Sequence, residues 1–239
     1  MMNEGPKDYR LFHYTRKKKH LLAMLRDGIW PRFSEEEFTW LGGRSDSEYF
    51  IAFPIASFCD IPIAAARDHR RKYGHYAIAV HKIYAEDLDI TPVWYIRDDG
   101  SYADALRQRF PRGARFTLRG AKHCDLFPFL PLLKITVGTQ PDRRSKGSES
   151  PEGIAFDEEC EWRIVSTVPS SDHWRESYQR GFVSESDHQQ SARAKVKLKP
   201  EMIAAVFVRT ARDVIDLRRI FRRTCPSLCR KIRLWPKRK

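Results

Sequence analysis

The chain of 239 residues lacks any long run of apolar side chains. No segment approaches the roughly 20 consecutive apolar residues that a membrane-spanning helix needs, so we expect no membrane partner. The first residues also lack the basic and then apolar pattern of a secretion signal. Because of these two absences, we expect neither a membrane protein nor a secreted protein.

Cysteine is scarce as well, with five residues and no repeated close pair. Cys225 and Cys229 are separated by three residues and have no second pair elsewhere, which gives little support for a zinc site. Reduced thiols in the cytoplasm are the simplest account, and we predict a cytoplasmic protein. Internal repeats and low-complexity tracts are also missing, and a hydrophobic content of 41% is typical of a globular chain.

Basic residues, in contrast, are abundant, and the net charge is +13 at pH 7. The excess is concentrated in the segment 209–239, with smaller groups at 16–19 and 67–72. Such a field attracts polyanions, so we expect a nucleic acid partner. The alternative is a basic face that serves solubility alone. The candidate nucleic-acid contacts are Arg218, Arg219, Arg222, Arg223, Arg230 and Lys231.

Short strands and amphipathic helices mix without strict alternation, which predicts an α+β fold. We expect one domain over 1–239, with a flexible loop at 139–153 where Ser, Gly, Pro and charged residues gather. Strands are expected at 9–14, 49–53, 76–80, 92–96, 195–198, 204–208 and 232–235. Helices are expected from Thr15 to Gly28 and at 63–73, 102–110, 121–135 and 210–223, and a loop at 34–47. In the first helix Thr15 would be the cap and Gly28 the stop.

An acidic run leads directly into an apolar strand at residues 157–165. Because side chains alternate along a strand, Glu159 and Glu161 point to the same face. Two such carboxylates are costly unless a cation, a hydrogen bond or a substrate uses them. One interpretation is a catalytic pair. The other is a solvated start of the strand, in which Arg163 forms an ion pair with Glu161 on the same face.

Two resemblances rest on stretches that occur in one order along the chain. The opening His13-Tyr14-Thr15, followed by a helix and a glycine, resembles ADP-ribosyltransferases of the DarT type. The stretches F-C-D-I-P at 58–62, Y-G-H-Y-A-I at 73–78, P-V-W-Y at 92–95 and E-C-E-W-R at 159–163 resemble the abortive phage resistance family AbiGi. The second resemblance implies anti-phage defence and a toxin or antitoxin partner.

The transferase resemblance implies NAD bound in a cleft between two small, mostly antiparallel sheets flanked by helices. Glu161 would stabilise the positive charge that develops on the ribose, and Glu159 would orient or deprotonate the acceptor. The residues expected to hold the cofactor are His13, Tyr14, Thr15, Asp60 and Tyr76. Each of three also has a structural alternative: His13 as a hydrogen bonder in the core, Asp60 as a helix cap and Tyr76 as a packing residue.

Three functional hypotheses follow. The first is a NAD-dependent ADP-ribosyltransferase of phage defence that acts on nucleic acid or on a protein bound to it. The second is a non-catalytic antitoxin or DNA-binding regulator that uses the basic C-terminal helix. The third, a nuclease with a metal held by Asp60 and the glutamate pair, has the least support.

Overall fold

The computed structural model describes residues 10–41, 49–110, 124–138, 154–155, 160–166, 174–177 and 179–236. The loop expected at 139–153 and the candidate Glu159 lie outside these residues.

The strands of the main sheet come from the whole length of the chain. They are β1 (Arg10–Thr15), β2 (Arg32–Glu37), β3 (Phe50–Cys59), β4 (Tyr76–His81), β5 (Ile90–Pro92), β10 (Glu161–Val165), β11 (Arg175–Ser177), β12 (Ile203–Val208) and β13 (Ile232–Leu234). Two small sheets join β6 (Trp94–Ile96) to β7 (Leu133–Ile135) and β8 (Val137–Gly138) to β9 (Ile154–Ala155). The helices are α1 (Lys18–Asp27), α2 (Ala66–Tyr73), α3 (Ser101–Arg109), α5 (Glu185–Gln190), α6 (Ala211–Phe221) and α7 (Pro226–Cys229).

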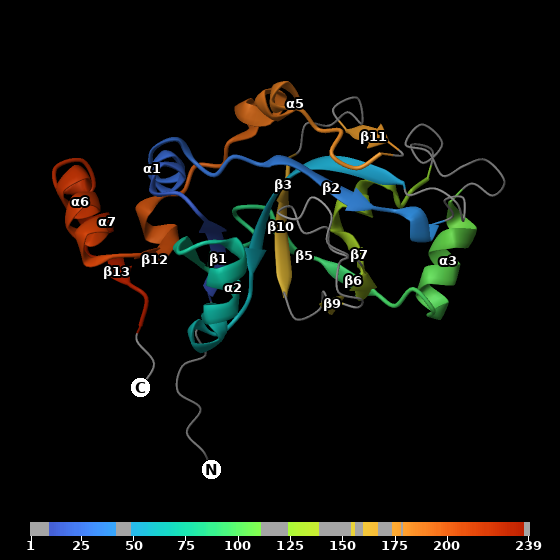
Figure 1. The fold of residues 1–239 in the computed structure, drawn as a ribbon, viewed down its shortest axis with the longest axis horizontal. Coiled ribbons are helices and arrows are strands. Elements are labelled where there is room, and N and C mark those ends of the chain that lie inside the picture. Colours follow the sequence, from blue (N-terminus) through green and yellow to red (C-terminus); the bar gives the residue numbers. More distant parts are fainter. Residues whose placement is uncertain are drawn as a thin grey trace, which may run out of the picture.

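Strand β3 lies at the centre of the main sheet (Figure 1). The strand order is β13-β12-β4-β1-β3-β10-β5, and β2 and β11 pair with the first half of β3. The ten residues of β3 are almost all buried, as the apolar sequence F-I-A-F-P-I-A-S-F-C requires for a central strand. Because β3 runs through both halves, the described strands form one large mixed sheet where two small sheets had been expected. The α+β class and the mostly antiparallel pairing are confirmed, with β12–β13 as the parallel pair of this sheet.

Apolar side chains on the two faces of the sheet form separate cores. On one face Leu11 and Phe58 join Leu21 of α1 and Leu217 of α6. On the other face Phe12 and its neighbours pack against α2 and Trp235. Figure 1 accordingly shows α1 with α6 on one side of the strands and α2 on the other. Alternation along β1 therefore assigns each of its side chains to one core or the other.

Several boundaries differ from the sequence prediction. Residues 32–37 form strand β2, although a loop was expected from Ser34 onward, because pairing with β3 overrides the polar composition of this segment. Thr15 does not cap α1, since it is the last residue of β1 and the helix begins after Lys17. Residues 127–132 form a 3₁₀ helix followed by β7, because Pro131 prevents a regular α-helix there.

Two other helix boundaries agree with the sequence prediction. Gly28 ends α1 with φ of +99°. Thr210 caps α6, where its hydroxyl and the Asp213 carboxylate form a reciprocal capping box.

The edge strand β5 ends in a proline, which has no N–H to offer an added strand. The Val93 N–H donates to Glu161 O at 2.9 Å, so the backbone of Val93 faces the neighbouring strand β10. Because backbone hydrogen-bonding groups alternate in direction along a strand, the backbone of Pro92 faces away from β10. The Ile90 N–H is also taken, by Ala85 O at 2.7 Å. This edge is therefore protected against strand addition. Among the described helices, none has the length and apolar content to cross a membrane.

Gly74 provides a test of the junction between α2 and β1. Its φ is +126°, and a Cβ there would lie 2.3 Å from Thr15 O. Gly74→Ala should therefore lower the free energy of unfolding by more than the roughly 1–2 kcal/mol of backbone strain alone, as measured by urea denaturation. Gly181→Ala is the matched control, because Gly181 also has a positive φ (+76°) but its Cβ would meet nothing within 4 Å. An equal loss of unfolding free energy in the two variants would contradict the close approach of Gly74 to Thr15 O.

Candidate functional site

Three of the four stretches that carry the AbiGi resemblance meet around Trp162. In the strand register Trp162 pairs with Phe58 on one side and with Pro92 on the other. Beyond the ends of the strands, the Asp60 N–H donates to Cys160 O at 2.9 Å. Residues 58–62, 92–95 and 160–163 thus form one continuous unit although they are far apart in sequence.

Glu161 and Arg163 form a buried ion pair on one face of this unit. Their side chains are 7% and 1% exposed. Arg163 Nε lies 2.9 Å from Glu161 Oε1 and Nη2 lies 3.1 Å from Oε2, which is a bidentate arrangement. Lys134 of β7 adds a second cation, with Nζ 3.2 Å from Glu161 Oε2.

The other contacts of Arg163 reach beyond Glu161. Nη2 lies 3.1 Å from Glu36 Oε2 of β2, and Nη1 donates to Pro131 O. The cluster therefore ties β2, β10 and the segment before β7 together. This arrangement agrees with the interpretation in which Arg163 forms an ion pair with Glu161. It differs in that the pair is buried, whereas a solvated pair was expected.

The electrostatics of the cluster favour the charged forms of both partners. Burial by itself raises the pKa of Glu161, but the attraction of Arg163 and then Lys134 outweighs it, and the pKa falls from 4.5 to about 2. Burial lowers the pKa of Arg163, and Glu161 with Glu36 more than offsets it, so that pKa is raised. Glu161 is thus a carboxylate with cations on its oxygens.

His13 lies on the opposite face of the sheet from Glu161. Cys59 pairs with both Phe12 and Glu161, so these three side chains share one face. His13 and Trp162, each one residue further along, point to the other. The His13 ring lies 5.2 Å from the Phe58 ring, and its Nδ1 lies 2.8 Å from Ser57 O. The structure does not bring the two expected cofactor and catalytic groups together.

His13 makes a hydrogen bond of the kind that the structural alternative describes, although its side chain is only half-buried. Burial lowers the pKa of its ring, and the hydrogen bond with Ser57 O opposes this effect.

The other expected cofactor residues are distributed around the sheet. Tyr14 stacks on Trp235 at 5.9 Å between ring centroids. Thr15 lies against Gly74, and the Tyr76 hydroxyl donates to Asp213 Oδ2 at 3.2 Å. These side chains lie at separate places around the sheet, and NAD binding stays a prediction from the resemblance.

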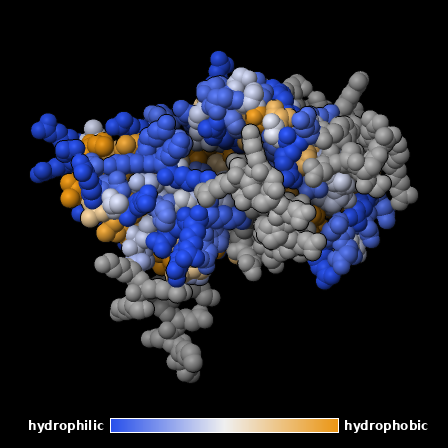
Figure 2. Space-filling model, viewed as in Figure 1, coloured by the Kyte–Doolittle hydropathy of each residue, from blue (hydrophilic) through white to orange (hydrophobic). Residues whose placement is uncertain are grey.

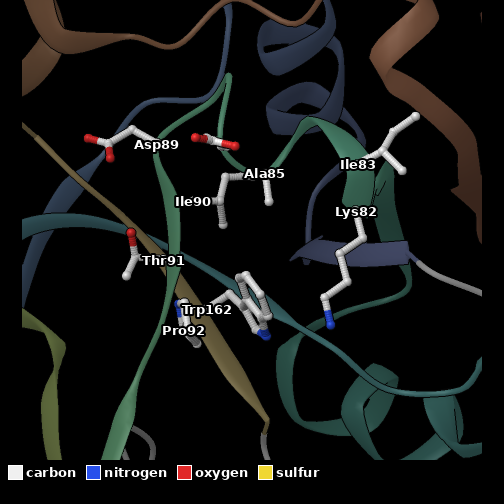
Figure 3. Close-up of a pocket in the computed structure, with 9 residues that line it drawn as sticks. Lys82, Ile83, Ala85, Asp89, Ile90, Thr91, Pro92 and Trp162 are labelled. Carbon is white, nitrogen blue, oxygen red and sulfur yellow. The ribbon is translucent and has the colours of Figure 1, made fainter.

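Asp60 does not cap a helix but pairs with Lys82, a residue that no sequence pattern singled out. Lys82 Nζ contacts Asp60 Oδ2 and lies 4.5 Å from the centroid of the Trp162 ring. Figure 3 shows Lys82 reaching toward Trp162. Both residues line a hollow of about 440 Å³. Within the described residues no three His, Cys, Asp or Glu side chains gather to hold a metal ion.

The six basic residues selected at the C-terminus divide into two groups. Arg218 donates to Cys229 O and Ile232 O at 3.2 and 2.9 Å, and Lys231 Nζ donates to Pro200 O and Ile203 O. These two hold the C-terminal segment against the sheet. The exposed side chains without such backbone contacts are those of Arg219, Arg222, Arg223 and Arg230.

The structure thus defines an α+β protein with a large mixed sheet, in which β3, β10 and β5 form one unit that carries the buried ion pair of Glu161 and Arg163. Residues 30–209, about three quarters of the chain, match the family described as "Putative abortive phage resistance protein AbiGi, antitoxin". The chain belongs to this family, and its role is abortive-infection defence against phage. No curated protein and no solved structure matches the chain.

The buried pair predicts a large cost when one partner is removed. Glu161→Gln leaves Arg163 with an uncompensated charge and should lower the free energy of unfolding by roughly 3–5 kcal/mol in urea denaturation. The double variant Glu161→Gln with Arg163→Met should lose less than the sum of the two single changes. The control removes the exposed ion pair of Arg97 and Asp99, which should change the free energy of unfolding little. Wild-type stability in Glu161→Gln would refute the role of the pair.

The same pair predicts an acid-sensitive contribution to stability. The pKa of Glu161 is lowered on folding, so its contribution is complete above a pH of about 4.5 and is lost as the pH falls toward about 2. The difference in unfolding free energy between wild type and Glu161→Gln should shrink across this window. A difference that stays constant from about pH 6 to about pH 2 would contradict the lowered pKa.

Proposed function

We propose that the protein acts in abortive infection as a non-catalytic antitoxin that binds nucleic acid through the outer face of α6. The observation that carries the proposal is the charge arrangement of this helix. Arg212, Ile215, Arg219 and Arg222 are exposed and follow one another at helical spacing, so they line one face. Leu217 and Phe221 on the inner side are buried.

The acidic residues of α6 do not cancel these arginines. Asp213 and Asp216 are both paired with Lys18 of α1, at 3.0 and 2.6 Å. Arg219 has only a 3.7 Å contact with Asp216, and Arg222 makes no ion pair with the described residues. The outer face therefore carries net positive charge, as phosphate contacts require. Figure 2 shows hydrophilic side chains interspersed with hydrophobic ones over the left end of the molecule, where Figure 1 places α6 and α7.

Binding is favoured over ADP-ribosyl transfer by the surroundings of Glu161. Its oxygens are occupied by Arg163 and Lys134, and it lies across the sheet from His13. A carboxylate that stabilises a developing positive charge must be able to face that charge. The fold therefore supports a surface role better than a catalytic one.

The test is binding of a double-stranded DNA fragment by fluorescence anisotropy at several salt concentrations. The variant with Arg219→Ala and Arg222→Ala should bind more weakly, and its slope of log K against log salt should be shallower by roughly 0.9 for each phosphate that is no longer neutralised. The control variant removes two exposed arginines of α2, Arg67 and Arg71, and should keep the wild-type slope.

Two results would count against the proposal. Equal weakening in both variants would mean that overall charge, and not α6, causes binding. Transfer of label from tagged NAD to DNA or protein by the wild-type chain would contradict the non-catalytic role.

A further inference from the structure

The hollow beside Trp162 is a wide, solvent-open depression on the surface, with a volume of about 440 Å³. Its lining is mixed: Ile83, Ile90, Pro92 and Trp162 provide the apolar part, and Lys82, Glu86, Asp89 and Thr91 provide the polar part. Figure 3 shows Ile83 and Lys82 on one side and Asp89, Thr91 and Pro92 on the other, with Trp162 between them.

Its rim carries the opposite charge from the molecule as a whole. Glu86 and Asp89 line the hollow, and Asp87 lies between them in the same loop. All three are exposed and make no ion pair with the described residues. Lys82, the cation of the lining, is already neutralised by Asp60. In a chain of net charge +13 this rim is locally negative.

The neighbouring edge strand limits how a partner can bind here. Pro92 has no N–H and the Ile90 N–H is taken by Ala85 O, so β5 offers no donors to an added strand. Recognition must then come from side chains. Ile83, which is 78% exposed, provides apolar surface on the side of the hollow opposite Asp89.

We propose that this hollow docks a basic segment of a protein partner. Arginine or lysine side chains of that segment pair with Glu86 and Asp89, and an apolar side chain packs against Ile83 and Trp162. Charge complementarity excludes a nucleic acid here, because its phosphates would meet carboxylates. The site is separate from α6, so it leaves the basic face open for another ligand.

The experiment measures binding of a short synthetic peptide in which arginine alternates with leucine, by isothermal titration calorimetry. The wild-type chain should bind it, and the variant with Glu86→Gln and Asp89→Asn should bind about tenfold more weakly because two charge-assisted hydrogen bonds are removed. Asparagine keeps the left-handed backbone at position 89, where φ is +53°, so the change tests charge and not folding.

Two controls make the result specific. Asp68→Asn removes a charge from α2, on the other face of the sheet, and should leave peptide affinity unchanged. A peptide with glutamate in place of arginine should not bind. The proposal is overturned if the double variant keeps wild-type affinity, if Asp68→Asn weakens binding as much, or if the glutamate peptide binds as well. None of these outcomes depends on DNA binding by α6.

Discussion

The ion pair of Glu161 and Arg163 is the interaction on which the centre of this protein depends. Both groups are removed from water, and two charges are tolerated there only because each finds its partner and Lys134, Glu36 and Pro131 O satisfy the remaining sites. Those partners come from β2, from β7 and from the segment leading into β7, whereas the pair itself is on β10. The pair therefore fixes the relative position of elements that are distant in sequence, which packing of apolar side chains alone does less specifically.

This arrangement changes the meaning of the acidic motif. A carboxylate at the head of a strand is compatible with catalysis, and it is equally compatible with a structural ion pair. The choice depends on what lies on the same face. In this fold that face holds Arg163 and Lys134, whereas His13 and the hollow beside Trp162 are on the other. The motif that supports the family assignment thus contributes Glu161 to the interior and Trp162 to a surface cavity.

Membership of the AbiGi family gives the biological setting, and we propose that the protein acts through two of its surfaces. Two surfaces of opposite charge lie on separate elements: the arginine face of α6 and the acidic rim around Trp162. An antitoxin that acts by binding needs at least one such surface for its toxin. Opposite charges allow two ligands to be discriminated without competition, because each surface repels the ligand of the other.

The sequence by itself determined the α+β class, most of the strands, the stop of α1 at Gly28 and the capped start of α6 at Thr210, since these follow from local periodicity and from residues with special backbone preferences. It also identified the stretches around Phe58 and Trp162. Only the tertiary structure decided that β3 joins both halves into one sheet, that polar residues 32–37 form a strand, and which side chains share a face. A one-residue difference in strand register exchanges the faces, and register is set by pairing across the sheet, which no local pattern records.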